Sequence, residues 1–164
     1  MCVDPVRTPG VIGLSAFLWV SASFCVFASE FSIELHVRAQ GQEQTASSNQ
    51  AASVRPVLSA KAGDPLWVKW IVANVQKSGA IPDVTVHVFL NRETRTDRPE
   101  TSKPASPAVF ENALIMDFNP GAKSSGELLL QTPAPGDYLL RVETIGTGRK
   151  AGQERFAAVG LKVQ

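Results

Sequence analysis

The chain has 164 residues, and its 16 lysines and arginines nearly balance 15 aspartates and glutamates, so the formal net charge is +1. Charges of both signs are interspersed, whereas a nucleic-acid-binding domain would show a basic stripe or patch. Composition therefore argues against nucleic acid as a partner and gives no support for binding to an anionic membrane surface.

The amino-terminal segment has the three-part layout of a secretory signal peptide. A short polar opening that contains Arg7 precedes the mostly apolar stretch VIGLSAFLWVSASFCVFA, which ends in small residues. This layout predicts that residues 1–28 are removed by cleavage after Ala28, and that the mature protein is secreted or periplasmic. The alternative is an uncleaved membrane anchor, because about 18 apolar residues is the lower limit for spanning a bilayer.

Both cysteines, Cys2 and Cys25, lie in this segment, so a mature chain of 136 residues (164 minus 28) would contain none. Folding of a domain of that size buries about two thirds of the unfolded surface, which makes disulfides unnecessary. Thiol redox chemistry and a blue-copper site are excluded, because both need cysteine.

Residues 31–38, FSIELHVR, alternate between apolar and polar side chains, which predicts a half-buried strand. The polar, low-complexity residues 40–53 offer no face to bury and are expected to be a mobile linker. We therefore expect residues 29–56 to form an amino-terminal strand and polar linker, and residues 57–164 to form one sandwich domain.

Seven further segments have the length and the β-branched or aromatic content of short strands. Residues 92–107 hold seven charges and three prolines and are expected to be an exposed loop. Turn signals at fairly regular intervals and the lack of an amphipathic helix predict an all-β, antiparallel sandwich of about seven to eight strands. The expected strands are residues 54–60, 66–75, 84–91, 108–118, 127–131, 138–146 and 155–163.

The stretch PGDYLLRV contains Tyr138, the only tyrosine of the chain. It resembles the corner of immunoglobulin-like sandwiches, where a tyrosine at the start of the penultimate strand bonds through its hydroxyl to the backbone upstream. The central strands of such domains resemble two successive stretches of this chain, GDPLWVKWIVANV and VTVHVFLN. In this resemblance Trp70 is the core tryptophan. Over residues 57–163 the chain is similar to the immunoglobulin-like and fibronectin-III-like domains of bacterial envelope proteins, including the cell-adhesion-related type.

One departure from antibody domains is that the cysteine pair between the sheets is missing, with Leu140 where the second cysteine would stand. The resemblance implies binding or architecture rather than catalysis, by analogy at the level of the fold.

A search for catalytic chemistry gives no catalytic residue, metal or cofactor. The only histidines are His36 and His87. They could share a metal ion with Glu34 or Asp83, but we favour the interpretation that both are solvated side chains on strand faces. No serine-nucleophile motif follows the signal segment. GTGRKA, residues 146–151, matches G-x-G-x-x-A, but too few residues follow it for the helix and strand of a dinucleotide site. We therefore predict that the protein is not an enzyme.

An unusual feature is a set of apolar side chains on the outer faces of two strands. If residues 66–75 and 84–91 pair across their connecting turn, Trp67, Ile71, His87 and Phe89 converge outside the core. Exposed apolar clusters often mark interfaces. The alternatives are that another segment covers this cluster or that the two faces are assigned the wrong way round.

The leading hypothesis is a secreted or periplasmic, non-catalytic binding or assembly module of the cell envelope that acts by protein–protein interaction, including self-association. The first alternative is a carbohydrate-binding accessory module that uses Trp67 and Phe89 as stacking platforms, which requires both rings to be exposed and roughly coplanar. The second is an enzyme or a metal-binding protein. A membrane would be contacted only through an uncleaved signal segment.

Export is testable by the intact mass of the protein recovered from the secreted or periplasmic fraction. We expect a mass that corresponds to a chain beginning at Ser29. Soluble material that still begins at Met1 would contradict processing.

Overall fold

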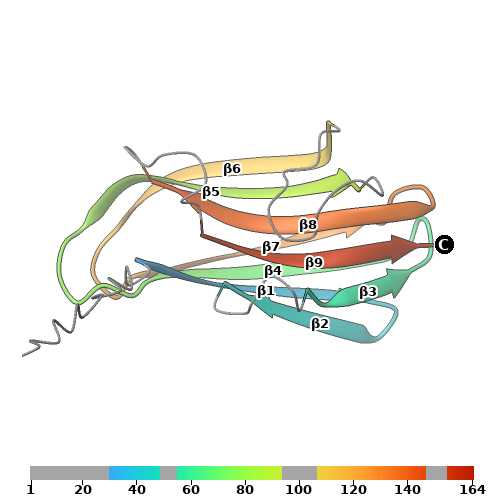
Figure 1. Ribbon diagram of the computed structural model, residues 1–164, viewed down its shortest axis with the longest axis horizontal. Helices are drawn as coiled ribbons and strands as arrows, with labels where there is room; N and C mark the ends of the chain where they lie inside the picture. The colour runs from blue at the N-terminus through green and yellow to red at the C-terminus, as the bar shows by residue number, and fades with distance from the viewer. Residues whose placement is uncertain (1–29, 49–54, 94–106, 147–154) are drawn as a thin grey trace, which may run out of the picture.

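Nine β-strands form two sheets that pack face to face (Figure 1). The computed structural model describes residues 30–48, 55–93, 107–146 and 155–164, and within them it contains no helix able to cross a membrane. The strands are β1 (Phe31–Ala39), β2 (Gln42–Ser47), β3 (Val57–Ala60), β4 (Pro65–Asn74), β5 (Ile81–Arg92), β6 (Ala108–Phe118), β7 (Lys123–Gln131), β8 (Gly136–Ile145) and β9 (Arg155–Val163).

The expected all-β, immunoglobulin-like sandwich is confirmed, with nine strands where seven to eight were predicted. One sheet has the order β2-β1-β4-β7 and the other β3-β9-β8-β5-β6. Neighbouring strands are antiparallel with the exception of β3 and β9, which run parallel.

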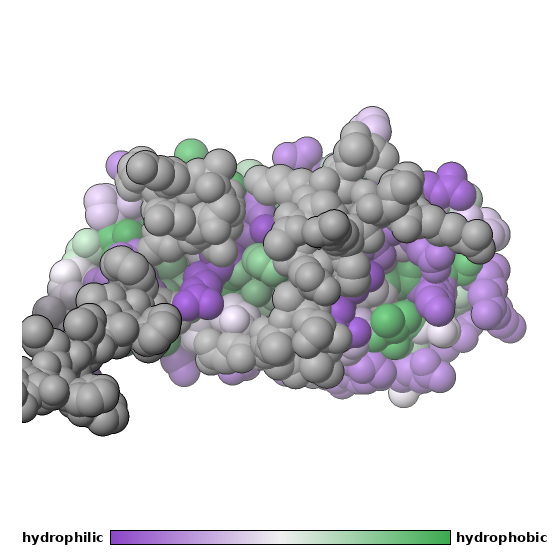
Figure 2. All heavy atoms as spheres, viewed as in Figure 1, coloured by the Kyte–Doolittle hydropathy of each residue, from purple (hydrophilic) through white to green (hydrophobic). Residues whose placement is uncertain are grey.

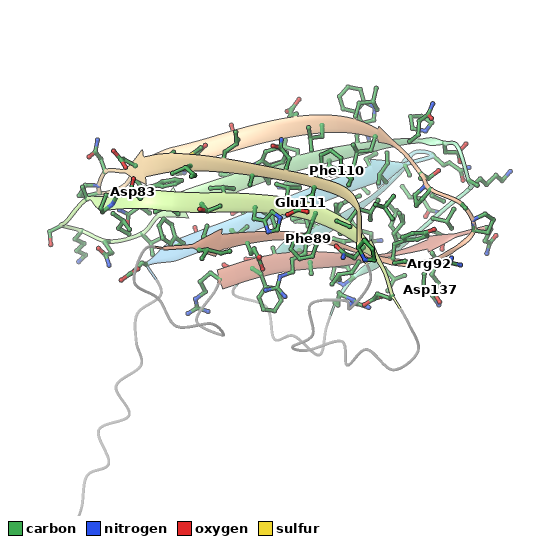
Figure 3. All side chains as sticks on the ribbon, turned by 90° about the horizontal axis from the view of Figure 1, so that it is seen from above. Asp83, Phe89, Arg92, Phe110, Glu111 and Asp137 are labelled. Carbon is green, nitrogen blue, oxygen red and sulfur yellow. The ribbon has the colours of Figure 1, made fainter. Side chains whose placement is uncertain are left out.

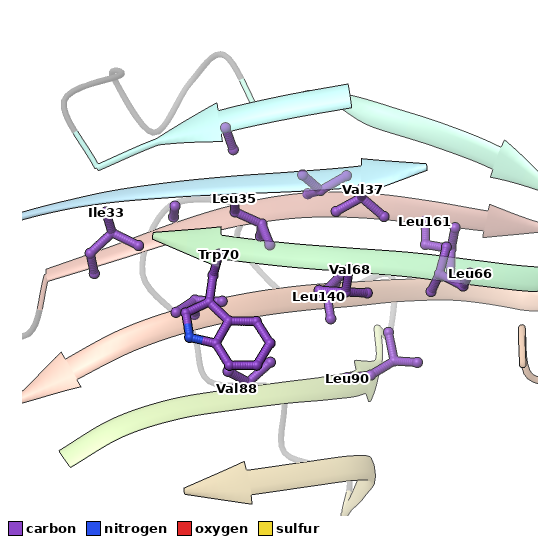
Figure 4. Packing of buried hydrophobic residues seen from close by; sticks show 14 of the residues in the cluster. Ile33, Leu35, Val37, Leu66, Val68, Trp70, Val88, Leu90, Leu140 and Leu161 are labelled. Carbon is purple, nitrogen blue, oxygen red and sulfur yellow. The ribbon is translucent and has the colours of Figure 1, made fainter. Parts of the chain in front are cut away.

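The core lies between the two sheets and follows from the alternation of the sequence. In β1 every second residue from Phe31 to Ala39 is buried, while Glu34 and Arg38 are exposed. Inward-facing rows of apolar side chains are also present on β4, β5, β8 and β9. The rows of both sheets therefore meet in one hydrophobic cluster (Figure 4). On the face viewed in Figure 2, hydrophilic side chains predominate and hydrophobic ones are scattered between them.

The prediction of a linker without secondary structure is wrong for β2, which pairs with β1 throughout its length. Gln40 and Gly41 both have positive φ, 49° and 75°, as a two-residue hairpin turn of the primed type requires. β2 is an edge strand whose only fully buried side chain is Ala46, so its composition is polar even though it forms a strand.

The expected pairing of the two most apolar strands is also wrong. β4 lies in the four-stranded sheet and β5 in the five-stranded sheet, so the connection between them, residues 75–80, crosses from one sheet to the other. Each strand is apolar because it has a neighbour on both sides within its own sheet, β1 and β7 for β4, and β8 and β6 for β5.

The tyrosine corner is confirmed at the start of β8, the penultimate strand. Tyr138 is buried, and its hydroxyl donates a hydrogen bond to the carbonyl oxygen of Ala134 over 2.7 Å. This bond connects the turn before β8 to Tyr138, the first inward-facing side chain of that strand. Leu140, two residues further on, is fully buried in the core at the position where antibody domains carry a cysteine.

Trp70 is the core tryptophan, as predicted, and projects from β4 toward the opposite sheet, which carries Val88 (Figure 4). Its neighbour on β7 is Gly126. A Cβ atom added at Gly126 would lie 2.1 Å from the six-membered ring of the indole. The glycine is therefore needed for space, because the indole occupies the volume that any other side chain would fill.

The signal segment, most of the loop at 92–107 and most of the GTGRKA stretch lie outside the described residues. The predictions made for them stay predictions.

Replacement of Tyr138 by Phe removes only the hydroxyl of the corner. We expect the free energy of unfolding to fall by about 1 kcal/mol, since Ala134 is exposed and its carbonyl can bind water instead. Urea unfolding monitored by tryptophan fluorescence measures the change. An unchanged stability would show that the corner bond contributes nothing.

Replacement of Gly126 by Ala places a methyl group against the Trp70 ring. We expect a loss of about 1–3 kcal/mol in unfolding free energy, as for other over-packed core positions. Ser125→Ala, at the neighbouring exposed position, is the matched control and should change stability by less than about 0.5 kcal/mol. Gly126→Ala should cost less stability in a Trp70→Phe background than in the parent protein; an equal cost in both would mean that the glycine acts through the backbone.

Candidate functional site

The structure separates the four residues of the predicted surface cluster. Trp67 and Ile71 lie on the outer face of the four-stranded sheet, whereas His87 and Phe89 lie on the outer face of the five-stranded sheet. The cause is the crossing of the chain between β4 and β5, which puts the whole core between the two pairs. Trp67 is 43% exposed, but Phe89 is only 4% exposed, so the two rings cannot form one stacking platform.

The outer face of the four-stranded sheet, which we call the Trp67 face, is built from side chains aligned in rows across the strands. Strand register sets each row, because residues directly opposite each other in an antiparallel pair share a face. The first row is Glu43, Arg38, Trp67 and Leu129; the second is Thr45, His36, Lys69 and Glu127; the third is Ser47, Glu34, Ile71 and Ser125.

Polar side chains contact one another within and between these rows. Lys69 Nζ lies 3.0 Å from Glu127 Oε1 across β4 and β7, and both side chains are more than half exposed. His36 Nδ1 lies 3.4 Å from Glu43 Oε1 and 3.2 Å from the hydroxyl of Thr45.

Trp67 stands next to a cation in its own row. The guanidinium carbon of Arg38 lies 5.8 Å from the centroid of the Trp67 ring, within the range of a cation–π contact. The ring is thus partly held in place while 43% of the side chain stays open to solvent.

The Trp67 face is hollowed. A depression of about 500 Å³ is lined by Trp67, Ile71, Val68 and His36 and by the charged side chains Arg38, Glu43, Lys69 and Glu127. Among these lining residues, two permanent cations are balanced by two carboxylates. The depression thus combines one aromatic surface, many hydrogen-bonding groups and no excess of either charge.

His87 and Phe89 belong to a second group on the outer face of the five-stranded sheet, which we call the His87 cluster. It consists of His87, Phe89, Glu111, Arg141 and Glu143, on β5, β6 and β8. His87 lies between two carboxylates, with Nδ1 3.1 Å from Glu143 and Nε2 2.8 Å from Glu111. Figure 3 shows Phe89 and Glu111 on their adjacent strands.

The buried members of the His87 cluster hold one another. Arg141 Nη2 lies 2.7 Å from Glu143 Oε2, and both side chains are almost fully buried. The Arg141 guanidinium also lies 3.9 Å from the Phe156 ring centroid, while the rings of His87 and Phe89 are 4.9 Å apart. Removal of either Arg141 or Glu143 would leave the other charge buried without its partner, which is strongly destabilising. The arrangement is that of a structural network rather than an open binding surface.

The two histidines lie on opposite outer faces of the sandwich, so they cannot share a metal ion. Within the described ranges, no group of three or more His, Cys, Asp or Glu side chains is arranged to hold one. Glu93, at the edge of the charged loop, is engaged by Arg55 through bonds of 2.7 and 2.9 Å to its two oxygens.

Sequence reasoning identified Trp67 and Ile71 but missed the side chains that surround them. The polar members of β1, Arg38 and His36, were assigned to solvent, and their position beside Trp67 depends on the pairing of β1 with β4. The alternation of β1 placed His36 and Arg38 on its outer face, but the strand that pairs with β1 could not be identified from the sequence.

Comparison with protein-family models found no match, and comparison with curated proteins found no significant one. Among solved structures, the chain is similar to the C-terminal domain of wzt, with 12% identity, 79% of this chain and 70% of that chain covered, and a TM-score of 0.44. It is also similar to the CARDB domain of the PF1109 protein from Pyrococcus furiosus, crystallised with di-metal ions, with 10% identity, coverage of 83% and 96%, and a TM-score of 0.43. Likeness at this level carries no argument about function.

Proposed function

We propose that the protein is an exported, non-catalytic binding module that recognises carbohydrate at the Trp67 face. The observation that supports this function best is the depression of about 500 Å³ around an exposed tryptophan on the outer face of a sheet. Sites that take small ligands are concave and place a few polar groups around an apolar or aromatic surface.

An exposed indole suits a sugar because one side of a pyranose ring presents C–H groups, which pack against an aromatic surface. Trp67 is well suited to this task, since Arg38 holds its ring and the rigid backbone of β4 carries it. Large, rigid aromatic side chains give contact area at a low cost in conformational entropy. The predicted two-ring platform is wrong, because Phe89 is buried on the other sheet, so the proposal rests on Trp67 alone.

The charged groups of the depression favour a ligand that is neutral and rich in hydroxyls. Lys69 and Glu127 already neutralise each other and stay solvated, so they can donate to and accept from hydroxyl groups without a large desolvation cost. A phosphate or nucleic acid would require an excess of cations, which the depression lacks.

A protein partner, the leading hypothesis from the sequence, is the competing occupant of the Trp67 face. Protein interfaces typically have an apolar centre from which charged residues are depleted. Here Lys69, Glu127 and Arg38 stand around Trp67 itself, so the centre is charged. We therefore favour carbohydrate at this face and treat protein binding as an outcome of the test.

The non-catalytic part of the proposal rests on the state of the titratable groups. The pair of carboxylates nearest to a histidine, Glu111 and Glu143, belongs to a network in which Glu143 is buried against Arg141. Acid–base catalysis needs a group that can reach a substrate. Glu143, fully buried, cannot do so, and the exposed Glu111 is bonded to His87 Nε2 over 2.8 Å.

Trp67→Ala should weaken carbohydrate binding without unfolding the protein. The mature protein is applied to an array of neutral and acidic oligosaccharides, and the strongest ligand is then titrated by calorimetry. We expect the dissociation constant to rise more than about tenfold, as for the loss of a central aromatic contact. The melting temperature should hardly change, because the side chain is 43% exposed.

Val57→Ala is the matched control, because Val57 is 45% exposed and lies on β3 in the other sheet. It should leave carbohydrate binding unchanged. Trp67→Phe should retain part of the affinity, since it keeps an aromatic ring. Absence of binding to every glycan on the array, or binding that survives Trp67→Ala, would contradict the proposal; a protein bound through Trp67 in place of a glycan would support the competing hypothesis.

A further inference from the structure

Strand β6 is an edge strand with an unusually apolar exposed surface. It ends the five-stranded sheet, so β5 is its one neighbour within that sheet in the described part of the chain. Three of its large apolar side chains are exposed: Ile115 (73%), Val109 (53%) and Leu114 (45%). Such a strand offers unpaired backbone groups together with apolar side chains, which is a template for pairing with another strand.

β6 also lacks most of the features that protect natural edge strands. Residues 108–118 contain no lysine, arginine, proline or glycine. A register shift beside Asn91 disturbs the pairing with β5 near Ala108, but from Phe110 to Met116 the pairing is regular. Proteins normally place lysines, prolines or bulges along an edge to prevent pairing, so this stretch of β6 is open to it.

The side chains of β6 are arranged symmetrically about Asn112, and this pattern identifies the occupant. In the sequence AVFENALIM, residues 108–116, the positions two, three and four residues on either side of Asn112 are all apolar, whereas the immediate neighbours are Glu111 and Ala113. A twofold interface needs such matching positions. If residue i of the first copy contacts residue j of the second, then residue j of the first copy also contacts residue i of the second. A foreign partner would impose no such symmetry.

We propose that β6 pairs antiparallel with β6 of a second copy of this chain, with Asn112 on the twofold axis. Phe110 then lies opposite Leu114 of the second copy, and Val109 lies opposite Ile115. The pairing buries the side chains that are most exposed in one copy. Cross-strand apolar pairs of this kind stabilise a sheet.

Charge is compatible with this register. Glu111 lies opposite Ala113 of the second copy, so no carboxylate directly faces another. On its own strand pair, Glu111 keeps its contact with His87 at 2.8 Å, because His87 lies on β5, away from the second copy. Asn112 meets its own equivalent on the axis, where one amide can donate to the other.

The association state of the full chain tests the proposal. Sedimentation equilibrium over a range of concentrations should show a reversible monomer–dimer equilibrium. Ile115→Lys should raise the dimer dissociation constant by more than about tenfold, because each copy loses a buried apolar contact and gains a lysine opposite Val109. Val57→Lys is the matched control: Val57 is 45% exposed on β3, at the opposite edge of the same sheet, and its change should leave the equilibrium unaltered.

A disulfide test fixes the register. In a chain with Cys2→Ser and Cys25→Ser, Asn112→Cys should form a cross-linked dimer on mild oxidation, since directly opposed residues have Cα atoms about 5 Å apart. Ala113→Cys, one position further, should cross-link poorly. Position 113 lies opposite position 111 of the second copy, so the two cysteines would be two residues apart along the partner strand.

A monomer at all concentrations would overturn the proposal, and so would a dimer that tolerates Ile115→Lys. Preferential cross-linking through position 113 would overturn the register centred on Asn112. None of these results depends on the Trp67 face, which lies on the other sheet, so this proposal and the proposed carbohydrate function fail independently.

Discussion

The packing of Trp70 into the gap left by Gly126 is the interaction on which the rest of the sandwich depends. The indole needs the space beside β7 that a missing side chain provides, and this fixes β4 against β7 in one register. A slip of one residue would exchange the two faces of a strand. The position of Trp70 inside the core therefore decides that Trp67, three residues earlier, points to solvent.

The same constraint explains why one sheet carries the proposed binding surface and the other a buried network. Inward rows from both sheets must be apolar, and the outward rows are free to carry other chemistry. On the four-stranded sheet the outward rows carry both cations and carboxylates around Trp67. On the five-stranded sheet they place Arg141 and Glu143 where both are nearly inaccessible, and there charge pairing serves stability.

Much of the fold could be predicted because its signals are local. The alternation of β1, the turn before β8, the corner at Tyr138 and the core position of Trp70 each depend on a few neighbouring residues. The failures concern relations between distant segments. β2 was missed because an edge strand with one buried alanine looks like a polar linker, although Gly41 after a strand was a usable hairpin signal.

The mistaken pairing of β4 with β5 has the same origin, and it divided the predicted cluster of Trp67, Ile71, His87 and Phe89. Adjacent strands in sequence pair more often than they cross between sheets, and nothing in residues 75–80 distinguishes the two cases. The partners of His87 could not be found from the sequence either, since Glu111 and Glu143 lie 24 and 56 positions away along the chain.

The two proposed surfaces, considered together, have a geometric consequence. Antiparallel pairing about Asn112 has its twofold axis perpendicular to the sheet, so two five-stranded sheets would join side by side with their inner faces on the same side. Both four-stranded sheets would then lie on that side, and both Trp67 faces would point away in the same direction. Two sites that face one way can engage a single long ligand or a single surface, and the second contact forms at a high effective concentration. A weak site that contains one tryptophan would thereby gain avidity for a polymer, while a free oligosaccharide too short to reach both sites would gain none.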